Sequence, residues 1–220
     1  MSFYTVTIDG PAGSGKSSVA REVAQRLGFT FLDTGALYRA AAVILEGSGC
    51  DIHNERECAD VLAKSSISIL EGKTYANGMD VSEVIRSHRI SELASTIAVH
   101  PSVRRELLSI QRSFKGLASL VAEGRDTGSV VFPDADIKFY LDATPQERAR
   151  RRHAETSDKE STAEMEQVLS DIKRRDERDA SRPVSPLKVP DNAVVVDTTH
   201  LKLEGVVEKV IAIIRDRLAD

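Results

Sequence analysis

An eight-residue motif near the start of the chain constrains the fold more than any other feature. Residues 10–17 read Gly-Pro-Ala-Gly-Ser-Gly-Lys-Ser and match the phosphate-loop pattern G-x-x-x-x-G-K-[ST] without a mismatch. An apolar, β-branched run at residues 3–8 precedes the motif, and an amphipathic helical pattern closed by Gly28 follows it. The alternative is an ordinary glycine-rich turn before a helix. The agreement of strand, loop and helix favours the phosphate loop.

A loop of this kind binds phosphate through its backbone. The glycines let N–H groups point inward at phosphate oxygens, and the following helix adds the positive end of its dipole. Lys16 is expected to reach the β- and γ-phosphates, and the Ser17 hydroxyl is expected to bind Mg²⁺. The sequence therefore predicts a site for a nucleoside triphosphate or a molecule shaped like one. The predicted ATP-binding residues are Gly10, Pro11, Ala12, Gly13, Ser14, Gly15, Lys16, Ser17 and Ser18.

Composition excludes several other classes of function. The net charge of −4 provides no basic field, so neither nucleic acid nor a membrane is expected as a partner. Cys50 and Cys58 lack metal-site spacing and are expected to be reduced thiols of a cytoplasmic protein. The sequence shows neither a secretory leader pattern nor an apolar run approaching about 18 residues. We expect a cytoplasmic, monomeric protein.

Strand-like runs alternate with helical patterns along most of the chain. Residues 36–46 are apolar enough for a packed helix, and a C-terminal amphipathic pattern carries Val206 and Val210 on its apolar face. Nearly continuous apolar strands separated by helices predict a parallel sheet covered on both faces. The predicted strands are residues 3–8, 29–32, 119–122, 137–141 and 193–196. The expected fold is thus α/β, with the five-stranded parallel sheet of phosphate-loop NTPases.

Two stretches depart from this alternation. Residues 66–81 alternate apolar and polar side chains and contain Asn77-Gly78, a hairpin signal, which predicts a small antiparallel insertion. Residues 154–166 carry almost no large apolar side chains, which favours a mobile flap.

The phosphate loop alone leaves GTPases, ATPases and small-molecule kinases open. The N-K-x-D and D-x-x-G motifs of GTPases are absent from the sequence, as is the apolar strand ending in Asp-Glu of helicases. Arginines spread over separate segments suit phosphoryl transfer between two anionic substrates, where catalysis consists of positioning and neutralising charge.

Five motifs are spread along the chain: T-I-D-G-P-A-G-S-G-K-S (7–17), L-D-T-G-A-L-Y-R (32–39), G-M-D-V-S-E-V-I-R (78–86), E-G-R-D-T-G-S-V-V-F-P-D-A (123–135) and I-K-R-R-D-E-R-D-A-S-R (172–182). Through these motifs the whole chain resembles one family, the bacterial cytidylate kinases, which are nucleoside monophosphate kinases. The resemblance implies transfer of the γ-phosphate of ATP to CMP, and to dCMP, with Mg²⁺. It also implies a core of residues 1–49, 101–149 and 181–220, a monophosphate-binding insertion at about 50–100 and a lid at about 150–180.

The resemblance also implies roles for single residues. Arg39, Arg104 and Arg125 would clamp the monophosphate, because a guanidinium binds phosphate through two bonds and keeps its charge. Thr34, which stands where some members have Ser, and Asp126 would face the cytosine. Ser95 and Arg182 would lie near that base, and Arg175 and Asp179 would face the ribose.

The implied lid arginines are Arg148 and Arg152, which share one face of a helix at i and i+4 and would swing onto the triphosphate. The residues expected to act in catalysis are Lys16, Arg125, Arg148 and Arg152.

Structural alternatives exist for these residues. Arg125 and Asp126 could form an ordinary ion pair, and the arginines of residues 148–152 and 173–179 could line solvated helix faces. Asp33 could assist Mg²⁺ through water or cap the following helix. Two other functions also remain open: a kinase for another small acceptor, such as UMP, a sugar acid or shikimate, and a nucleotide-dependent RNA-binding module that uses the basic clusters.

Overall fold

The computed structural model describes residues 3–156 and 162–219. It describes the side chains of these residues except those within 155–164. The chain divides into two compact units. Unit 1 consists of Met1–Leu32 and Gly116–Asp220, and unit 2 consists of Asp33–Lys115.

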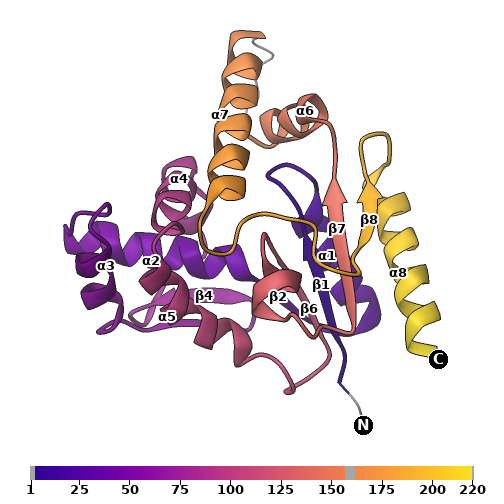
Figure 1. Ribbon diagram of the computed structural model, residues 1–220, viewed down its shortest axis with the longest axis horizontal. Coiled ribbons are helices and arrows are strands. Elements are labelled where there is room, and N and C mark those ends of the chain that lie inside the picture. Colours follow the sequence, from indigo (N-terminus) through magenta and orange to yellow (C-terminus); the bar gives the residue numbers. More distant parts are fainter. Residues whose placement is uncertain (1–2, 157–161, 220) are drawn as a thin grey trace. The chain divides into compact units, whose positions relative to one another are not determined.

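Unit 1 is built on a parallel sheet whose strand order is β2-β6-β1-β7-β8 (Figure 1). The central strand β1 pairs in parallel with both β6 and β7, and Asp9, its last residue, lies opposite Gly124 of β6. From β1 the chain crosses to β2 in one direction along the sheet, and from β6 it crosses to β7 in the other. The direction of the connections therefore reverses between the neighbouring strands β1 and β6. Such a reversal places a ligand site at the carboxyl ends of the strands. The strands are β1 (Thr5–Asp9), β2 (Thr30–Asp33), β6 (Leu120–Gly124), β7 (Ile137–Asp142) and β8 (Val194–Asp197).

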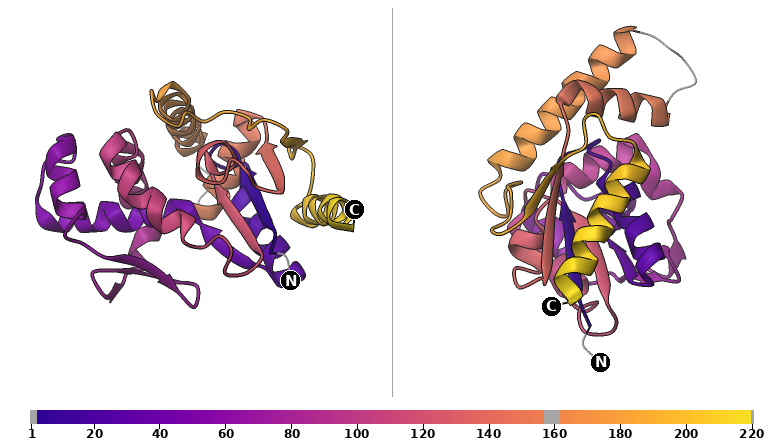
Figure 2. Two further views of the ribbon diagram at one scale, coloured as in Figure 1. Left: turned by 60° about the horizontal axis from the view of Figure 1, so that its bottom comes forward. Right: turned by 90° about the vertical axis from the view of Figure 1, so that its right-hand side faces the viewer.

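The helices α1 (Lys16–Leu27) and α8 (Leu203–Ala219) pack against each other and against this sheet. The right-hand view of Figure 2 shows α8 lying along the strands. The apolar periodicity of both helices places their valines and isoleucines in one core with the inward side chains of the strands. That core contains Val6, Ile8, Val19, Val23, Phe139, Leu141, Val207, Val210 and Ile214. The predicted α/β fold with a five-stranded parallel sheet is confirmed.

Two further helices of unit 1, α6 (Pro145–Thr156) and α7 (Thr162–Ser181), lie side by side (Figure 1). The predicted flap, residues 154–166, spans the end of α6 and the start of α7. Its central residues 157–161 lie outside the described part of the chain, and the rest of it is helical. The mobility of this stretch stays a prediction.

Unit 2 consists of helices around a small antiparallel sheet with the order β3-β4-β5. This sheet confirms the predicted antiparallel insertion, and Asn77, at the predicted turn between β4 and β5, has a φ of 50°. A second turn at Glu71-Gly72, with a φ of 51° at Glu71, joins β3 to β4. The elements are α2 (Thr34–Ser48), α3 (Glu55–Leu62), β3 (Ile67–Leu70), β4 (Lys73–Ala76), β5 (Met79–Asp80), η1 (Val84–Arg86), α4 (His88–Ile97) and α5 (Pro101–Arg112).

The helix predicted at residues 36–46 is longer than expected, and it runs through Gly47 to Ser48. It begins earlier because the Asp33 side chain accepts the N–H of Ala36 at 2.9 Å and caps the first turn. The capping role of Asp33, one of its two alternatives in the sequence, is therefore observed.

Candidate active site

The phosphate loop connects β1 to α1 and lies against the first turns of α6. Gly13 has a φ of 74°, and a Cβ atom there would come within 2.7 Å of the Arg148 carbonyl oxygen. A side chain at this position would therefore push the loop off α6, so the close approach explains the glycine.

Basic side chains bind the outward-pointing carbonyl oxygens of this loop. Arg125 donates to Gly10 O at 2.9 Å and Lys16 donates to Pro11 O at 3.1 Å. Arg148 donates to Ala12 O at 3.0 Å, and Arg151 donates to Ser14 O at 3.3 Å. The N–H of Ser14 donates within the loop, to Pro11 O at 3.4 Å. With its carbonyls directed at these cations, the loop can offer its other N–H groups to an anion.

The helix α1 begins directly after the loop, and Gly15 at its N-cap offers no side chain to its first N–H groups. Lys16 is almost completely buried beside them. The Ser17 hydroxyl donates to Glu123 Oε1 at 2.8 Å. Glu123 lies near the carboxyl end of β6 and is buried, so a carboxylate and a hydroxyl meet at the loop. Glu123 was not among the residues predicted from the sequence, although an acidic residue at the end of an apolar strand is a usable signal.

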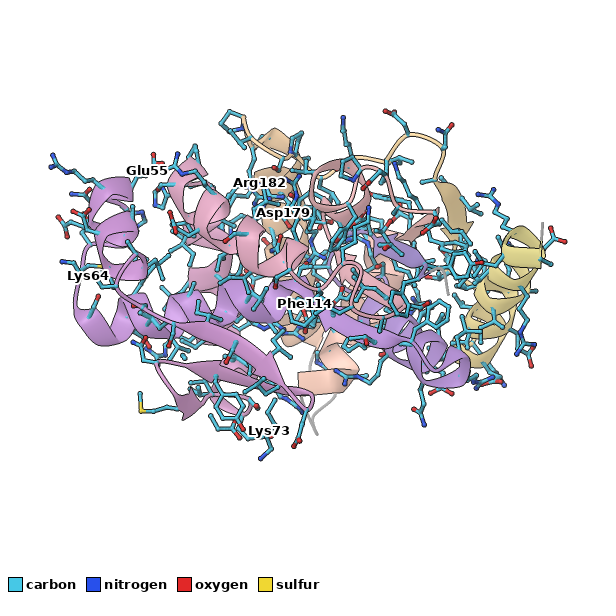
Figure 3. All side chains as sticks on the ribbon, turned by 90° about the horizontal axis from the view of Figure 1, so that it is seen from below. Glu55, Lys64, Lys73, Phe114, Asp179 and Arg182 are labelled. Carbon is cyan, nitrogen blue, oxygen red and sulfur yellow. The ribbon has the colours of Figure 1, made fainter. Side chains whose placement is uncertain are left out.

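A buried charge cluster lies next to the loop. Arg125 Nε donates to Asp179 Oδ2 at 3.0 Å, and Arg182 NH1 lies 3.7 Å from Asp179 Oδ1. Figure 3 labels Asp179 and Arg182, which lie close together near the end of α7. Burial alone would raise the pKa of Asp179, but Arg125, Arg182 and Arg175 outweigh burial and lower it. The structure thus brings together four of the residues that the resemblance assigned to the acceptor.

Asp126 follows Arg125 and caps a short π-helical turn, η2 (Thr127–Val131). Its carbonyl accepts the N–H groups of Val130 at 2.8 Å and Val131 at 3.2 Å. Asp126 is 6% exposed, so its carboxylate lies in a largely dry environment. Single π-helical turns of this kind occur frequently at functional sites.

Unit 2 holds the other predicted acceptor residues. Thr34 and Arg39 lie on α2, and Arg39 pairs with Asp33 at 2.7 Å. Arg104 of α5 is buried, donates to Ala98 O at 3.2 Å and lies over the Tyr38 ring at 5.4 Å. Ser95 of α4 is likewise buried. The roles of these four residues toward the acceptor stay predictions.

The two arginines predicted to act from a lid, Arg148 and Arg152, differ in position. Arg148, buried on α6, pairs with Asp176 of α7 as well as with the loop. Arg151, which the sequence did not single out, binds the loop and donates to Thr198 O at 2.6 Å. Arg152 shares the helix face of Arg148 and is half-buried. The direct link from α6 to the phosphate loop is therefore made by Arg148 and Arg151.

The described residues contain no group of three or more His, Cys, Asp or Glu side chains arranged around a common metal position. Among the same residues, no helix combines the length and the apolar character that a membrane span requires.

A phosphate loop with its lysine and buried arginines, at the reversal point of a parallel sheet, defines a phosphate-loop kinase. Comparison with known proteins gives the family: the cytidylate kinase family model matches residues 6–216. The chain therefore belongs to the cytidylate kinase family, whose members are nucleoside monophosphate kinases.

Individual relatives agree with this assignment. The cytidylate kinase of Carboxydothermus hydrogenoformans is 43% identical over 95% of this chain and 96% of its own. That of Caldanaerobacter subterraneus is 44% identical over 96% of this chain and 94% of its own. A crystal structure of an uncharacterised protein from Eubacterium ventriosum has a TM-score of 0.54 and 11% identity, and the match covers 96% of this chain and 98% of that one. This last likeness concerns the fold alone.

Proposed function

We propose that this protein transfers the γ-phosphate of ATP to CMP, and also to dCMP, giving ADP and the pyrimidine nucleoside diphosphate. Membership of the cytidylate kinase family supports the reaction. One observation carries the proposal: the guanidinium of Arg125, assigned to the acceptor, donates to Gly10 O of the phosphate loop at 2.9 Å. Donor and acceptor groups of a phosphoryl transfer must be held in line within a few ångströms, and this contact joins the two sites.

On the donor side, the loop amides and the positive end of α1 would bind the triphosphate, and Lys16 would neutralise charge on the transferring group. Ser17 and Glu123 fit Mg²⁺, which prefers oxygen ligands, because their hydroxyl and carboxylate oxygens already meet at 2.8 Å. When bound, Mg²⁺ would neutralise phosphate charge. Arg148 and Arg152 are proposed to add positive charge from the lid.

On the acceptor side, the proposal assigns the base to Asp126. Its carboxylate accepts hydrogen bonds only, which suits the 4-amino donor of cytosine. The monophosphate would be held by arginines, because the acceptor phosphate is already a nucleophile and needs positioning rather than a base. The proposed phosphate-binding residues are Arg39, Arg104 and Arg125, and those for the nucleoside are Thr34, Ser95, Asp126, Arg175, Asp179 and Arg182.

The proposal also includes a core of residues 1–49, 101–149 and 181–220, a monophosphate-binding insertion at about 50–100 and a lid at about 150–180. We expect the lid to close when both nucleotides are bound, because phosphoryl transfer requires that water be excluded. Hydrogen exchange followed by mass spectrometry should show added protection in residues 150–180 only with both nucleotides present. Equal protection in the free and doubly bound enzyme would contradict the lid.

The decisive experiment is an acceptor screen with ATP and Mg²⁺ that follows ADP release. CMP and dCMP should be the best acceptors, UMP should be much poorer, and shikimate and sugar acids should be inactive. A better rate with any of these other acceptors would overturn the proposal. Omitting Mg²⁺ should abolish turnover. A cytoplasmic, monomeric enzyme remains part of the proposal, and sedimentation velocity measures the oligomeric state.

A further inference from the structure

The carboxylate of Asp9 is buried at the end of the central strand. Asp9 ends β1 and is completely inaccessible to solvent. Its Oδ1 accepts the backbone N–H of Thr127 at 2.8 Å, and its Oδ2 accepts that of Gly128 at 2.7 Å. Burial raises the pKa of Asp9 to about 6, although the two backbone amides counteract the rise. A charge is costly in such a place unless hydrogen-bonded, so these two amides are essential partners.

The two amides belong to the residues that directly follow Arg125 and Asp126. The residue before this pair, Gly124, lies opposite Asp9 in the pairing of β6 with β1. Asp9 thus fixes the backbone on both sides of the Arg125–Asp126 dipeptide. The directions in which these two side chains project depend on that backbone.

A second, independent observation concerns how closely this turn lies on β1. A Cβ atom at Gly128 would come within 2.6 Å of Thr7 Oγ1 and within 3.3 Å of Asp9 Oδ2. Such a distance to Thr7 cannot occur without movement, so the turn rests directly on the strand. Its position is therefore set both by contact and by the carboxylate.

We propose that Asp9 is a positioning residue that holds Arg125 and Asp126 in the geometry needed to bind the acceptor and select its base. This inference rests on the proposed function, in which Arg125 binds the acceptor phosphate and Asp126 binds cytosine. Asp9 itself touches no substrate in this proposal. Its loss should therefore weaken acceptor binding and base selection while ATP binding persists, because Lys16, Arg148 and Arg151 still hold the loop.

The variant Asp9→Asn tests the role directly. It keeps the size of the side chain but removes the charge and turns an NH₂ group toward one of the two backbone N–H groups. We expect the KM for CMP to rise about tenfold, in line with the loss of a hydrogen bond to a charged group. The ratio of kcat/KM for CMP over UMP should fall several-fold, and the KM for ATP should stay within about twofold. No change in the KM for CMP, or an equal rise in both KM values, would overturn the proposal.

A second variant displaces the same turn without altering Asp9. Gly128→Ala should raise the KM for CMP and lower the base preference in the same way. Adding Thr7→Ala removes the oxygen that the new methyl group meets, and should return the KM for CMP toward the wild-type value. A defect that does not arise from this contact would not be reversed by the second change, so failure of the rescue counts against the proposal.

The matched control is Asp136→Asn. Asp136 Oδ2 accepts the N–H of Thr5 at 2.7 Å, which is the same kind of anchor at the opposite end of β1. This variant should leave both KM values unchanged, and a tenfold rise in its KM for CMP would contradict a specific role for Asp9.

Wild-type enzyme that fails to phosphorylate CMP would refute the proposed function. Wild-type activity on CMP with an unchanged KM in Asp9→Asn would refute only the inference.

Discussion

The phosphate loop and the η2 turn lie at the carboxyl ends of neighbouring strands and are anchored with opposite polarity. The loop is held through its carbonyl oxygens, which accept hydrogen bonds from the side chains of Arg125, Lys16, Arg148 and Arg151. The turn is held through its N–H groups, which are bound by the Asp9 carboxylate. The first arrangement leaves backbone amides for a ligand, and the second leaves side chains. Donor phosphates are therefore expected to be recognised mainly by backbone, and the acceptor mainly by side chains.

The strongest test of this comparison is Lys16→Ala, because Lys16 is the one loop side chain expected to act on the transferring phosphoryl group. The variant should fold and lose at least about 10²-fold in kcat, a usual cost for removing such electrostatic stabilisation. Steady-state kinetics on purified protein measures the loss. Lys209→Ala, an exposed change on α8, is the control and should be neutral. Near wild-type kcat in Lys16→Ala would remove the role given to the loop.

Asp126→Asn should alter which acceptor is used rather than whether the enzyme works. The amide offers both a donor and an acceptor, so uracil no longer meets an unmatched charge in a dry site. The ratio of kcat/KM for CMP over UMP should narrow by roughly tenfold, about 1.4 kcal/mol. An unchanged ratio, with both acceptors losing activity alike, would assign Asp126 to orienting Arg125.

The smallest predicted effect concerns stability and pH. The pKa of Asp9 is about 6 in the folded protein against an ordinary 3.8, so the folded state retains a proton that the unfolded chain has released. The contribution of Asp9 to the unfolding free energy should therefore be present at low pH and be lost as the pH rises through about 6. Between about pH 5 and about pH 7.5 the loss amounts to about 1 kcal/mol. Urea unfolding measures the unfolding free energies of wild type and Asp9→Asn, and the wild-type value minus the variant value should fall over this pH interval. A constant difference between the two free energies would contradict the prediction.

The sequence predicted the regular parts of this fold well, and the reason is visible in unit 1. A strand such as residues 137–141 is apolar except at Lys138, so its burial on both faces can be read from composition. The turn at Glu71-Gly72 was missed because glutamate rarely adopts a positive φ, and only Asn77-Gly78 has the usual residues. The helix predicted at residues 36–46 extends to Ser48, because Gly47 continues it although glycine commonly ends a helix.

The candidate site was predictable to a lesser extent. The loop could be recognised from its spacing alone, whereas the roles of Arg125 and Asp126 came from a resemblance. Arg151 could not be distinguished from its neighbours, because three consecutive arginines differ only in the direction that the helix gives them. Asp9 and Glu123 act through contacts more than 100 positions away along the chain, as Glu123 does with Ser17 at 2.8 Å. Contacts between residues so far apart cannot be inferred from spacing along the sequence.

The pairing of Arg148 with the Ala12 carbonyl and with Asp176 has a consequence for the turnover cycle. In the proposed reaction, a phosphate that binds this guanidinium must replace both contacts, so the net gain in affinity would be only the difference between the new contacts and the old ones. We expect the reverse exchange as ADP departs, when the arginine regains its earlier partners. Such an exchange would make the enzyme bind its nucleotides less tightly than their charges suggest, and release them faster.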